Sequence, residues 1–193
     1  MNYYNGNWAV IKMPKCGSTW IRNVFHVLYG IEQHGKHDWL GDDLGVWTGN
    51  KYHAIPFSPQ KIKLVLTVIR DPYDWLGSYY RFTAGTNEFK GIDTGGSFGD
   101  MLRGMEDGAV DRIYQTYTQH STHIGRLESI QKDLSLFLGL IGAGKFACAG
   151  PALNKTNTDG FEDKDFIENR HIVGSKNPIA TELYKRASEI ARC

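Results

Sequence analysis

A strand, a tight turn and a helix follow one another between residues 8 and 29, and this segment constrains the chain most. The apolar run Trp8–Met13 favours a strand, and the amphipathic run Ser18–Tyr29 favours a helix with one buried face. Backbone N–H groups at a helix N-terminus have no intrahelical partner, and the helix dipole attracts negative charge there. The turn therefore predicts a phosphate or sulfate site with a lysine, one glycine and two hydroxyl residues, namely Lys15, Gly17, Ser18 and Thr19.

The turn differs from the loop that binds nucleoside triphosphates. That loop has two glycines followed directly by Lys and then Ser or Thr, whose hydroxyl holds magnesium. Here Lys15 precedes the single glycine of the turn, and no Ser or Thr follows a lysine at the start of the helix. The pattern favours anion binding without ATP hydrolysis. A purely structural interpretation, in which Gly17 makes the turn and Ser18 caps the helix, stays open on this segment alone.

A second segment combines a buried strand with an arginine and a serine. The continuous apolar run Leu64–Ile69 is typical of a parallel strand, and Pro72 fits the first turn of a following helix. Ser78 then stands about two turns into that helix, and Arg70 stands just before it. An arginine fork grips a phosphate bidentately, so Arg70 and Ser78 could share one anion. The alternative is a surface ion pair between Arg70 and Asp74.

Together these segments resemble the sulfotransferases that use 3′-phosphoadenosine 5′-phosphosulfate (PAPS). Pro-Lys-x-Gly-[Ser/Thr]-Thr-Trp resembles their 5′-phosphosulfate loop, and residues 70–82 are similar to their 3′-phosphate segment. The resemblance assigns the 3′-phosphate to Arg70 and Ser78. It implies that the tryptophan closing the first loop stacks on the adenine. It assigns the 5′-phosphosulfate end to the first loop, so that the implied contacts there are Lys15, Cys16, Gly17, Ser18, Thr19 and Trp20.

A third segment, Lys51 to Phe57, resembles the Lys-Thr-His-Leu-Pro stretch of cytosolic sulfotransferases. The resemblance implies that His53 is the catalytic base and that Lys51 helps to hold the sulfuryl group. A neutral imidazole is available near neutral pH, which suits removal of a proton from an acceptor hydroxyl. The connection from His53 to Arg70 is a few residues shorter than in the animal enzymes. His34 and His37 form a rival pair, and His37 stays open as the base.

Later segments resemble carbohydrate sulfotransferases. Residues 123–133 are similar to their Gly-Arg-Phe-Glu segment, in which a strand runs into a helix. The tyrosine that cytosolic members place near Leu127 is missing, and so is their Arg-Lys-Gly motif on the 3′-phosphate. Lys155 and Lys176 are candidates for that missing charge. Residues 30–50 are expected to form part of the acceptor pocket or to close the core, with Trp39 and Trp47 serving either purpose.

Composition fits one α/β enzyme domain. The chain has 193 residues and a net charge of +1, so no strong field would recruit nucleic acid or a membrane. Three cysteines without metal-ligand spacing suggest a reduced setting, and Cys16 is expected to be a small filler more than a reactive thiol. No apolar run approaches the ~20 residues that cross a bilayer. The N-terminus lacks a signal-peptide core. These features lead to the expectation of a cytoplasmic protein.

The expected fold is a single domain over residues 1–193, with a mostly parallel sheet and helices on both faces in a P-loop-like sandwich. Further helices are expected near 98–103, 110–118, 127–141 and 178–192.

The expected function is in-line transfer of a sulfuryl group from PAPS to an acceptor hydroxyl or amine, with adenosine 3′,5′-bisphosphate (PAP) as product and no metal. The acceptor, a small molecule or carbohydrate, and the oligomeric state stay open. The alternatives are a non-catalytic nucleotide-binding protein and a P-loop kinase or nucleotide hydrolase.

Overall fold

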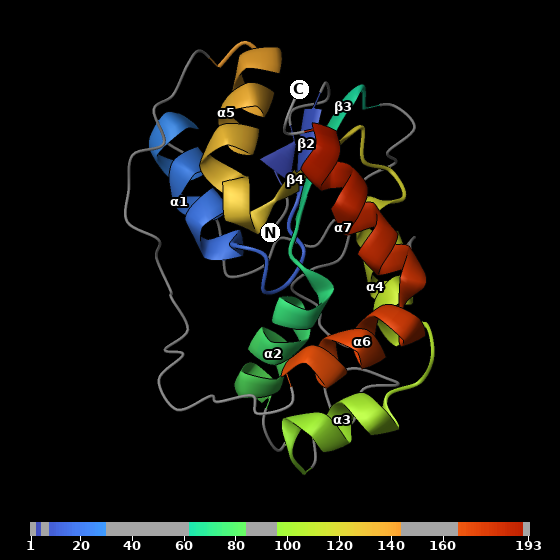
Figure 1. The fold of residues 1–193 in the computed structure, drawn as a ribbon. Coiled ribbons are helices and arrows are strands. Elements are labelled where there is room, and N and C mark those ends of the chain that lie inside the picture. The colour runs from blue at the N-terminus through green and yellow to red at the C-terminus, as the bar shows by residue number, and fades with distance from the viewer. Residues whose placement is uncertain (1–2, 5–7, 30–61, 84–95, 144–165, 191–193) are drawn as a thin grey trace. The chain divides into compact units, whose positions relative to one another are not determined.

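The computed structural model describes residues 3–4, 8–29, 62–83, 96–143 and 166–190 (Figure 1). The chain divides into two compact units, Met1–Ile69 with Thr116–Asn154 and Arg70–Gln115 with Lys155–Cys193. The first unit contains a mainly parallel sheet with helices, and the second contains helices. The α/β class expected from the sequence is therefore confirmed. The single domain over residues 1–193 stays a prediction.

A four-stranded sheet forms the core of the first unit, in the order β1 (Tyr3–Tyr4), β2 (Trp8–Ile11), β3 (Leu64–Ile69) and β4 (His123–Arg126). β1 is antiparallel to β2, whereas β2, β3 and β4 are parallel. β2 is entirely buried and β3 almost so, which explains their unbroken apolar sequences. Because the three strands are parallel, β2 and β4 end at the same edge of the sheet.

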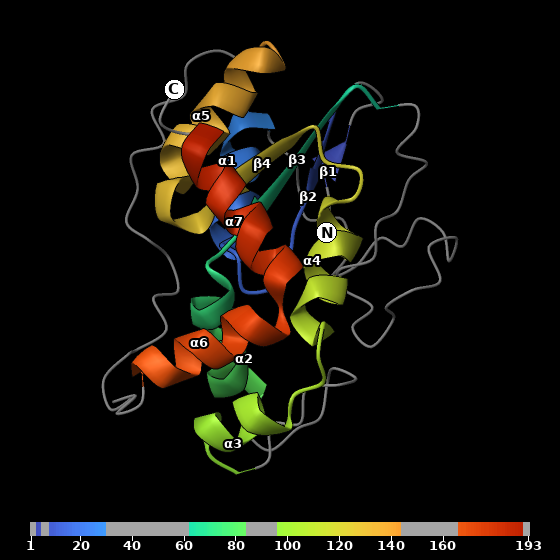
Figure 2. The ribbon, with the colours of Figure 1, turned by 45° about the vertical axis from the view of Figure 1, so that its right-hand side comes forward.

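One face of this sheet is covered by α1 (Ser18–Tyr29) and α5 (Ile130–Leu140). The Trp8 ring of β2 lies 5.5 Å from the Phe25 ring of α1 and 6.4 Å from the Phe137 ring of α5, between ring centroids. Both helices lie on the same side of the strands in the two views (Figure 1, Figure 2). Trp20, Ile21, Val24 and Phe25 of α1 are buried, in agreement with the buried face predicted from its periodicity.

The opposite face of β3 presents a buried hydroxyl. Thr67 is completely buried, and its hydroxyl donates to the backbone carbonyl of Tyr117 at 2.9 Å and lies 2.6 Å from the Ser121 hydroxyl. Tyr117 belongs to the last turn of α4 (Ala109–Thr118). Successive residues of a strand point to opposite faces, so one threonine can interrupt an apolar strand without disturbing the α1–α5 side.

The second unit consists of α2 (Pro72–Thr83), α3 (Phe98–Gly104), most of α4, α6 (Phe166–Lys176) and α7 (Pro178–Ile190). Its core is aromatic: Trp75 and Tyr79 of α2 stack with ring centroids 5.4 Å apart, and Tyr114 of α4 meets Trp75 edge-on. α6 packs against both α2 and α3. The sequence predicts the other four helices, but it does not predict α6, whose apolar residues do not gather on one face.

Buried polar side chains fix the helix ends of the second unit. The Asn177 carboxamide oxygen accepts from the Val110 N–H at 2.9 Å, and the Asp111 carboxylate accepts from the Ala180 N–H at 2.7 Å. Each residue thus satisfies a donor at the N-terminus of another helix. The Lys176 ammonium donates to the carbonyl oxygens of Arg103 and Met105, at 2.8 and 2.6 Å. Lys176 therefore holds the end of α3, a role that competes with the phosphate contact considered for it above.

The start of α3 carries a pH-dependent cap. The Ser97 N–H donates to the Asp100 carboxylate at 3.0 Å, and the Asp100 N–H donates to the Ser97 hydroxyl at 3.2 Å. Hydrogen bonds from the Ser97 side chain and then from Arg103 lower the pKa of Asp100 to about 2.

Because this pKa is depressed, the cap should stabilise the folded state above the unfolded pKa of about 4 and lose that effect as pH falls towards 2. Thermal unfolding of wild type and Asp100→Asn, followed from pH 5 to 2, should show a difference in Tm that disappears over this range. A difference of the same size at every pH would contradict this account of the cap.

Within the described ranges, none of the helices combines the length and apolar character needed to cross a membrane.

Candidate anion-binding site

The loop between β2 and α1 combines buried and partly exposed residues. Lys12, Met13, Pro14 and Cys16 are buried, whereas Lys15 is partly exposed. Gly17, Ser18 and Thr19 are also partly exposed. The buried residues anchor the loop at the end of β2. The groups that the sequence assigns to an anion are therefore those that a ligand can reach.

The sign of φ alternates along this loop, as it does in backbone nests that bind anions. Lys15 has φ +62° and Gly17 has φ +75°, whereas φ of Cys16 between them is not positive. Successive residues of opposite handedness turn their N–H groups into one concavity, as in phosphate-binding loops. A lysine in the left-handed region costs about 1–2 kcal/mol relative to the right-handed one. Within the described ranges Lys15 is the only non-glycine residue with positive φ, and such residues concentrate at functional sites.

The first hydrogen bonds of the loop and of α1 show which backbone donors stand before the hydrogen-bond ladder of the helix. The Cys16 N–H donates to the Met13 carbonyl at 3.4 Å, which closes the turn. The Ile21 N–H donates to the Gly17 carbonyl at 3.0 Å, which is the first bond that enters α1. The N–H groups of Ser18 and Thr19 precede that bond and have no partner within the helix. An anion would therefore meet these donors, and the Cys16 N–H would contribute less than the sequence suggests.

Gly17 is fixed by contact as well as by conformation. A Cβ at this position would stand 2.8 Å from Cδ1 of Leu127 and 2.9 Å from Cδ1 of Ile130. Leu127 opens the short 3-10 helix η3 (Leu127–Ser129), which connects β4 to α5. The loop after β2 and the connection after β4 are thus pressed together at one edge of the sheet. A side chain at Gly17 would therefore require the terminal methyl groups of Leu127 and Ile130 to turn aside, or the loop itself to shift.

Asp133 holds the connection against which Gly17 packs. Its carboxylate accepts from the Arg126 N–H at 2.7 Å and from the Ser129 hydroxyl at 2.8 Å. These bonds fix the sharp bend from β4 through η3 into α5. The strand-to-helix transition predicted for residues 123–133 is confirmed. Asp133, which the sequence analysis does not single out, supports the connection against which the loop between β2 and α1 packs.

Cys16 lies beneath the loop and is not a reactive thiol at its surface. Its side chain is 1% exposed. Burial, and after it the charge of Cys16, raises the pKa of the Tyr117 hydroxyl. Buried cysteines in apolar surroundings are inert and behave as small hydrophobic residues. The structure therefore favours the interpretation of Cys16 as filler.

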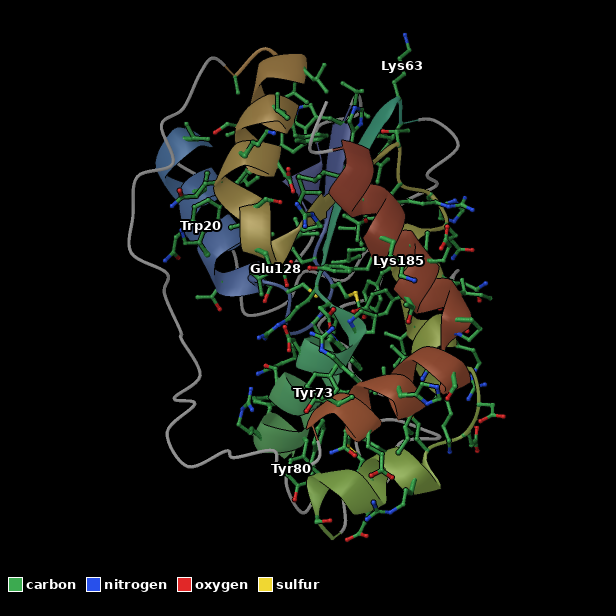
Figure 3. The ribbon with its side chains drawn as sticks, viewed as in Figure 1. Trp20, Lys63, Tyr73, Tyr80, Glu128 and Lys185 are labelled. Carbon is green, nitrogen blue, oxygen red and sulfur yellow. The ribbon has the colours of Figure 1, made fainter. Side chains whose placement is uncertain are left out.

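Trp20 contributes mainly to the core. It lies on α1 (Figure 3), and only 8% of its surface is exposed. Stacking of an aromatic ring on a base requires an open face of the ring. The burial of Trp20 favours a packing role over the adenine contact that the family resemblance implies for it.

In the segment predicted to bind the 3′-phosphate, residues 70–82, Asp71 caps the N-terminus of α2. The Asp71 carboxylate accepts from the N–H groups of Tyr73 and Asp74 at 3.0 and 3.3 Å, and Pro72 is the first residue of α2 as predicted. These donors at the start of α2 already have a partner. An anion at this segment would therefore depend on the side chains of Arg70, which is partly exposed, and Ser78, which is 2% exposed.

Arg170 of α6 takes the ion pairs near this cap. Its guanidinium lies 3.0 Å from the Asp71 carboxylate and 3.8 Å from the Asp74 carboxylate, and it stands over the Tyr73 ring at 5.2 Å. Among the described residues, no ion pair joins Arg70 to Asp74, which was the structural alternative for this segment. Burial, followed by the Asp71 charge, raises the pKa of Asp74, against the effect of three arginines, Arg70, Arg170 and Arg81.

Tyr114 holds the backbone of Arg70. The Tyr114 hydroxyl donates to the Arg70 carbonyl at 2.6 Å, and its side chain is fully buried. The bond fixes the residue at which the chain leaves β3 for α2. Tyr114 is therefore a positioning residue for Arg70.

Tyr114→Phe should lower the free energy of unfolding by about 0.5–1.5 kcal/mol, because the partly buried Arg70 carbonyl loses its donor. Chemical denaturation measures this loss. The matched control is Tyr80→Phe, which removes an exposed bond of 2.7 Å to the Gly96 carbonyl and should cost less. Equal losses in the two variants would contradict a positioning role for Tyr114.

Several predicted site residues lie outside the described residues. They are the two proposed catalytic residues of the third segment, the lysine considered for the 3′-phosphate, the rival histidines and the two tryptophans of the acceptor region, namely Lys51, His53, Lys155, His34, His37, Trp39 and Trp47. Their roles stay predictions.

In the part of the chain that the structure describes, no three His, Cys, Asp or Glu side chains gather as a metal ion would require.

No protein-family model, curated protein or solved structure matches the chain. The function must therefore be argued from the residues and their geometry.

Proposed function

We propose that the protein is a sulfotransferase that moves the sulfuryl group of PAPS to an acceptor hydroxyl or amine. The observation that carries the proposal is the loop from Lys12 to Thr19. It combines a nest-like backbone, a lysine in a strained conformation and the open N-terminus of α1. The finer fold that goes with this proposal is a P-loop-like sandwich around a parallel sheet.

The loop suits the 5′-phosphosulfate end of the donor. The N–H groups of Ser18 and Thr19, their hydroxyls and the Lys15 ammonium are all donors, and two of these residues begin α1. Such a set recognises the oxygens of a phosphate or sulfate. PAPS supplies an activated sulfuryl group, and Lys15 would stabilise the charge that develops on the bridging oxygen as its bond to sulfur breaks.

The segment around α2 suits the 3′-phosphate. Arg70 stands directly before the capped start of the helix, and Ser78 lies two turns further along. An arginine fork and a hydroxyl form a site for a terminal phosphate, which nucleotides without a 3′-phosphate would not fill. Because Ser78 is buried, its hydroxyl would contact only an anion that has lost its hydration shell.

The acceptor chemistry is assigned to residues of the third segment. The acceptor oxygen attacks sulfur while its proton passes to His53, and the bond between sulfur and the bridging oxygen breaks to release PAP. Lys51 would hold the sulfuryl oxygens during transfer. No charge is left unbalanced, because the proton lost by the acceptor is taken up by the base.

A direct test is incubation of the protein with PAPS carrying labelled sulfur and a panel of alcohols, phenols, sugars and amines. The proposal predicts a labelled product with at least one acceptor class and release of PAP. Binding of PAP without transfer to any acceptor would favour a non-catalytic nucleotide-binding protein. Turnover of ATP with magnesium and no affinity for PAP would favour a kinase or nucleotide hydrolase.

A further inference from the structure

We propose that Arg170 is a positioning residue of the 3′-phosphate site, where it neutralises two aspartates at the start of α2 and so keeps Arg70 available to the phosphate. The inference rests on the proposed function, because it concerns the same ligand. It is carried by the contacts of the Arg170 guanidinium and by the charges at the start of α2, all of which belong to the second unit.

Three side chains of α2 hold the Arg170 guanidinium. One of its terminal nitrogens lies 3.0 Å from the Asp71 carboxylate, and the other lies 3.8 Å from the Asp74 carboxylate. The guanidinium also stands over the Tyr73 ring, which Figure 3 labels, at 5.2 Å from its centroid. A planar fork can contact two carboxylates and stack on a ring at the same time, which an ammonium group does less well. These contacts therefore use properties particular to arginine.

The two aspartates stand where they would oppose a phosphate. Asp71 directly follows Arg70, and its carboxylate already accepts from the N–H groups at the start of α2. Asp74 and Ser78 are four residues apart and share one face of α2. A phosphate on the Ser78 hydroxyl would thus lie about one turn from the Asp74 carboxylate, and like charges at such a distance repel. Binding of the 3′-phosphate here requires that the charge of the aspartates is offset.

Arg170 determines the charge at the start of α2. Arg70 contributes one positive charge, and Asp71 and Asp74 contribute two negative charges, so these three residues together carry −1. Arg170, in contact with both aspartates, brings the group to zero. Only 14% of the Asp71 side chain is exposed, so water screens its charge little and the direct contact with Arg170 has a correspondingly large effect.

Arg70 itself stays outside these ion pairs. Its backbone carbonyl is held by the Tyr114 hydroxyl, and across the described ranges its guanidinium forms no ion pair with either aspartate. Without Arg170, both carboxylates would attract the neighbouring Arg70 guanidinium and repel the phosphate. Arg170 thereby sets the affinity for the 3′-phosphate through Asp71 and Asp74, without a contact of its own to the ligand.

Isothermal titration of PAP and 5′-AMP into wild type, Arg170→Gln and the double variant Arg170→Gln/Asp74→Asn tests the inference. Arg170→Gln should weaken PAP binding by about 10-fold and leave 5′-AMP binding unchanged, because only PAP carries the 3′-phosphate. Asp74→Asn then removes one carboxylate, returns the group to zero charge and should restore most of the PAP affinity. Asp71 is kept in every variant because it caps α2.

The double variant distinguishes this role from a merely structural one. If Arg170 only tied α6 to α2, Asp74→Asn would remove a second tie, and the two losses would add instead of cancelling. Asp74→Asn alone should strengthen PAP binding by about 2–5-fold, and it provides the comparison if Arg170→Gln does not fold. The matched control is Arg186→Gln, which breaks an exposed ion pair with Glu182 on α7 and should leave the binding of both ligands unchanged.

The outcomes separate this inference from the proposed function. If wild type binds PAP and Arg170→Gln binds it equally well, the role of Arg170 is wrong and the sulfotransferase proposal stands. An equal loss of PAP and 5′-AMP binding, no recovery in the double variant, or no gain in Asp74→Asn alone would also overturn the role. If wild type does not bind PAP, the proposed function is wrong, and the role of Arg170 is wrong with it.

Discussion

Replacement of Lys15 by alanine should reduce the rate of sulfuryl transfer by about 10²–10³-fold, the loss typical of one missing donor to a developing negative charge. Lys15 is the only cation that the loop exposes after β2, since Lys12 is 5% exposed. Its left-handed backbone stores strain that a purely structural turn would avoid by using glycine. The measurement is single-turnover transfer from labelled PAPS to the best acceptor of the panel.

Two variants show whether the effect comes from the ammonium group. Lys15→Gly removes the same charge but relieves the strain at φ +62°, so it should be about 1 kcal/mol more stable than Lys15→Ala and equally inactive. Lys185→Ala removes an exposed lysine on α7 (Figure 3) and should leave transfer unchanged. Full activity in Lys15→Ala would refute the mechanism, and normal activity in Lys15→Gly would assign the lysine a structural role only.

Replacement of Gly17 by alanine should cause the largest loss of stability at the site, about 2–4 kcal/mol. About 1–2 kcal/mol of this is the cost of φ +75° for a residue with a Cβ, and the rest is the collision with the δ-carbons of Leu127 and Ile130. To accept the new methyl group, the δ-carbons of Leu127 and Ile130 would have to turn aside or the loop between β2 and α1 would have to shift. PAP binding should therefore fall together with the free energy of unfolding, which denaturant titration measures.

Gly142 provides a matched control for the backbone term. Its φ is +76°, nearly that of Gly17, but nothing lies within 4 Å of the Cβ that alanine would add. Gly142→Ala should therefore show only the backbone cost. Adding Leu127→Ala to Gly17→Ala should recover part of the collision energy in a double-mutant cycle. If Gly17→Ala and Gly142→Ala lowered the free energy of unfolding by the same amount, the contacts of Gly17 with Leu127 and Ile130 would not constrain the loop.

Much of this fold can be predicted from local sequence, because hydrophobic periodicity and the backbone preference of proline act within a single helix or strand. The helix Ser18–Tyr29 and the strand Leu64–Ile69 have the bounds that their hydrophobic patterns predict. Pro72 marks the start of α2 for a similarly local reason, because its ring fixes a helical φ and it needs no donor. α6 was missed because its packing against α2 and α3 does not depend on an amphipathic pattern.

The supporting residues of the site have no local signal. Tyr114 is 44 residues from the Arg70 carbonyl that it holds, and Arg170 is 99 residues from Asp71. Such pairs depend on the tertiary fold, which spacing along the chain does not encode. The positive φ of Lys15 could not be predicted from the sequence either, because lysine has no preference for this conformation. The adenine contact that the resemblance implies for Trp20 stays a prediction, although only 8% of this residue is exposed.

The proposed function assigns the 5′ end of the nucleotide to the loop of Lys15 and the 3′-phosphate to the segment of Arg70, and calorimetric titration with three ligands tests these two assignments most directly. PAP, 5′-AMP and 3′-AMP would be titrated into wild type, Lys15→Ala and Arg70→Gln. We expect Lys15→Ala to weaken PAP and 5′-AMP but not 3′-AMP, and Arg70→Gln to weaken PAP and 3′-AMP but not 5′-AMP, each by about 10–100-fold. Absence of PAP binding to wild type, or the same ligand preference in both variants, would contradict these assignments.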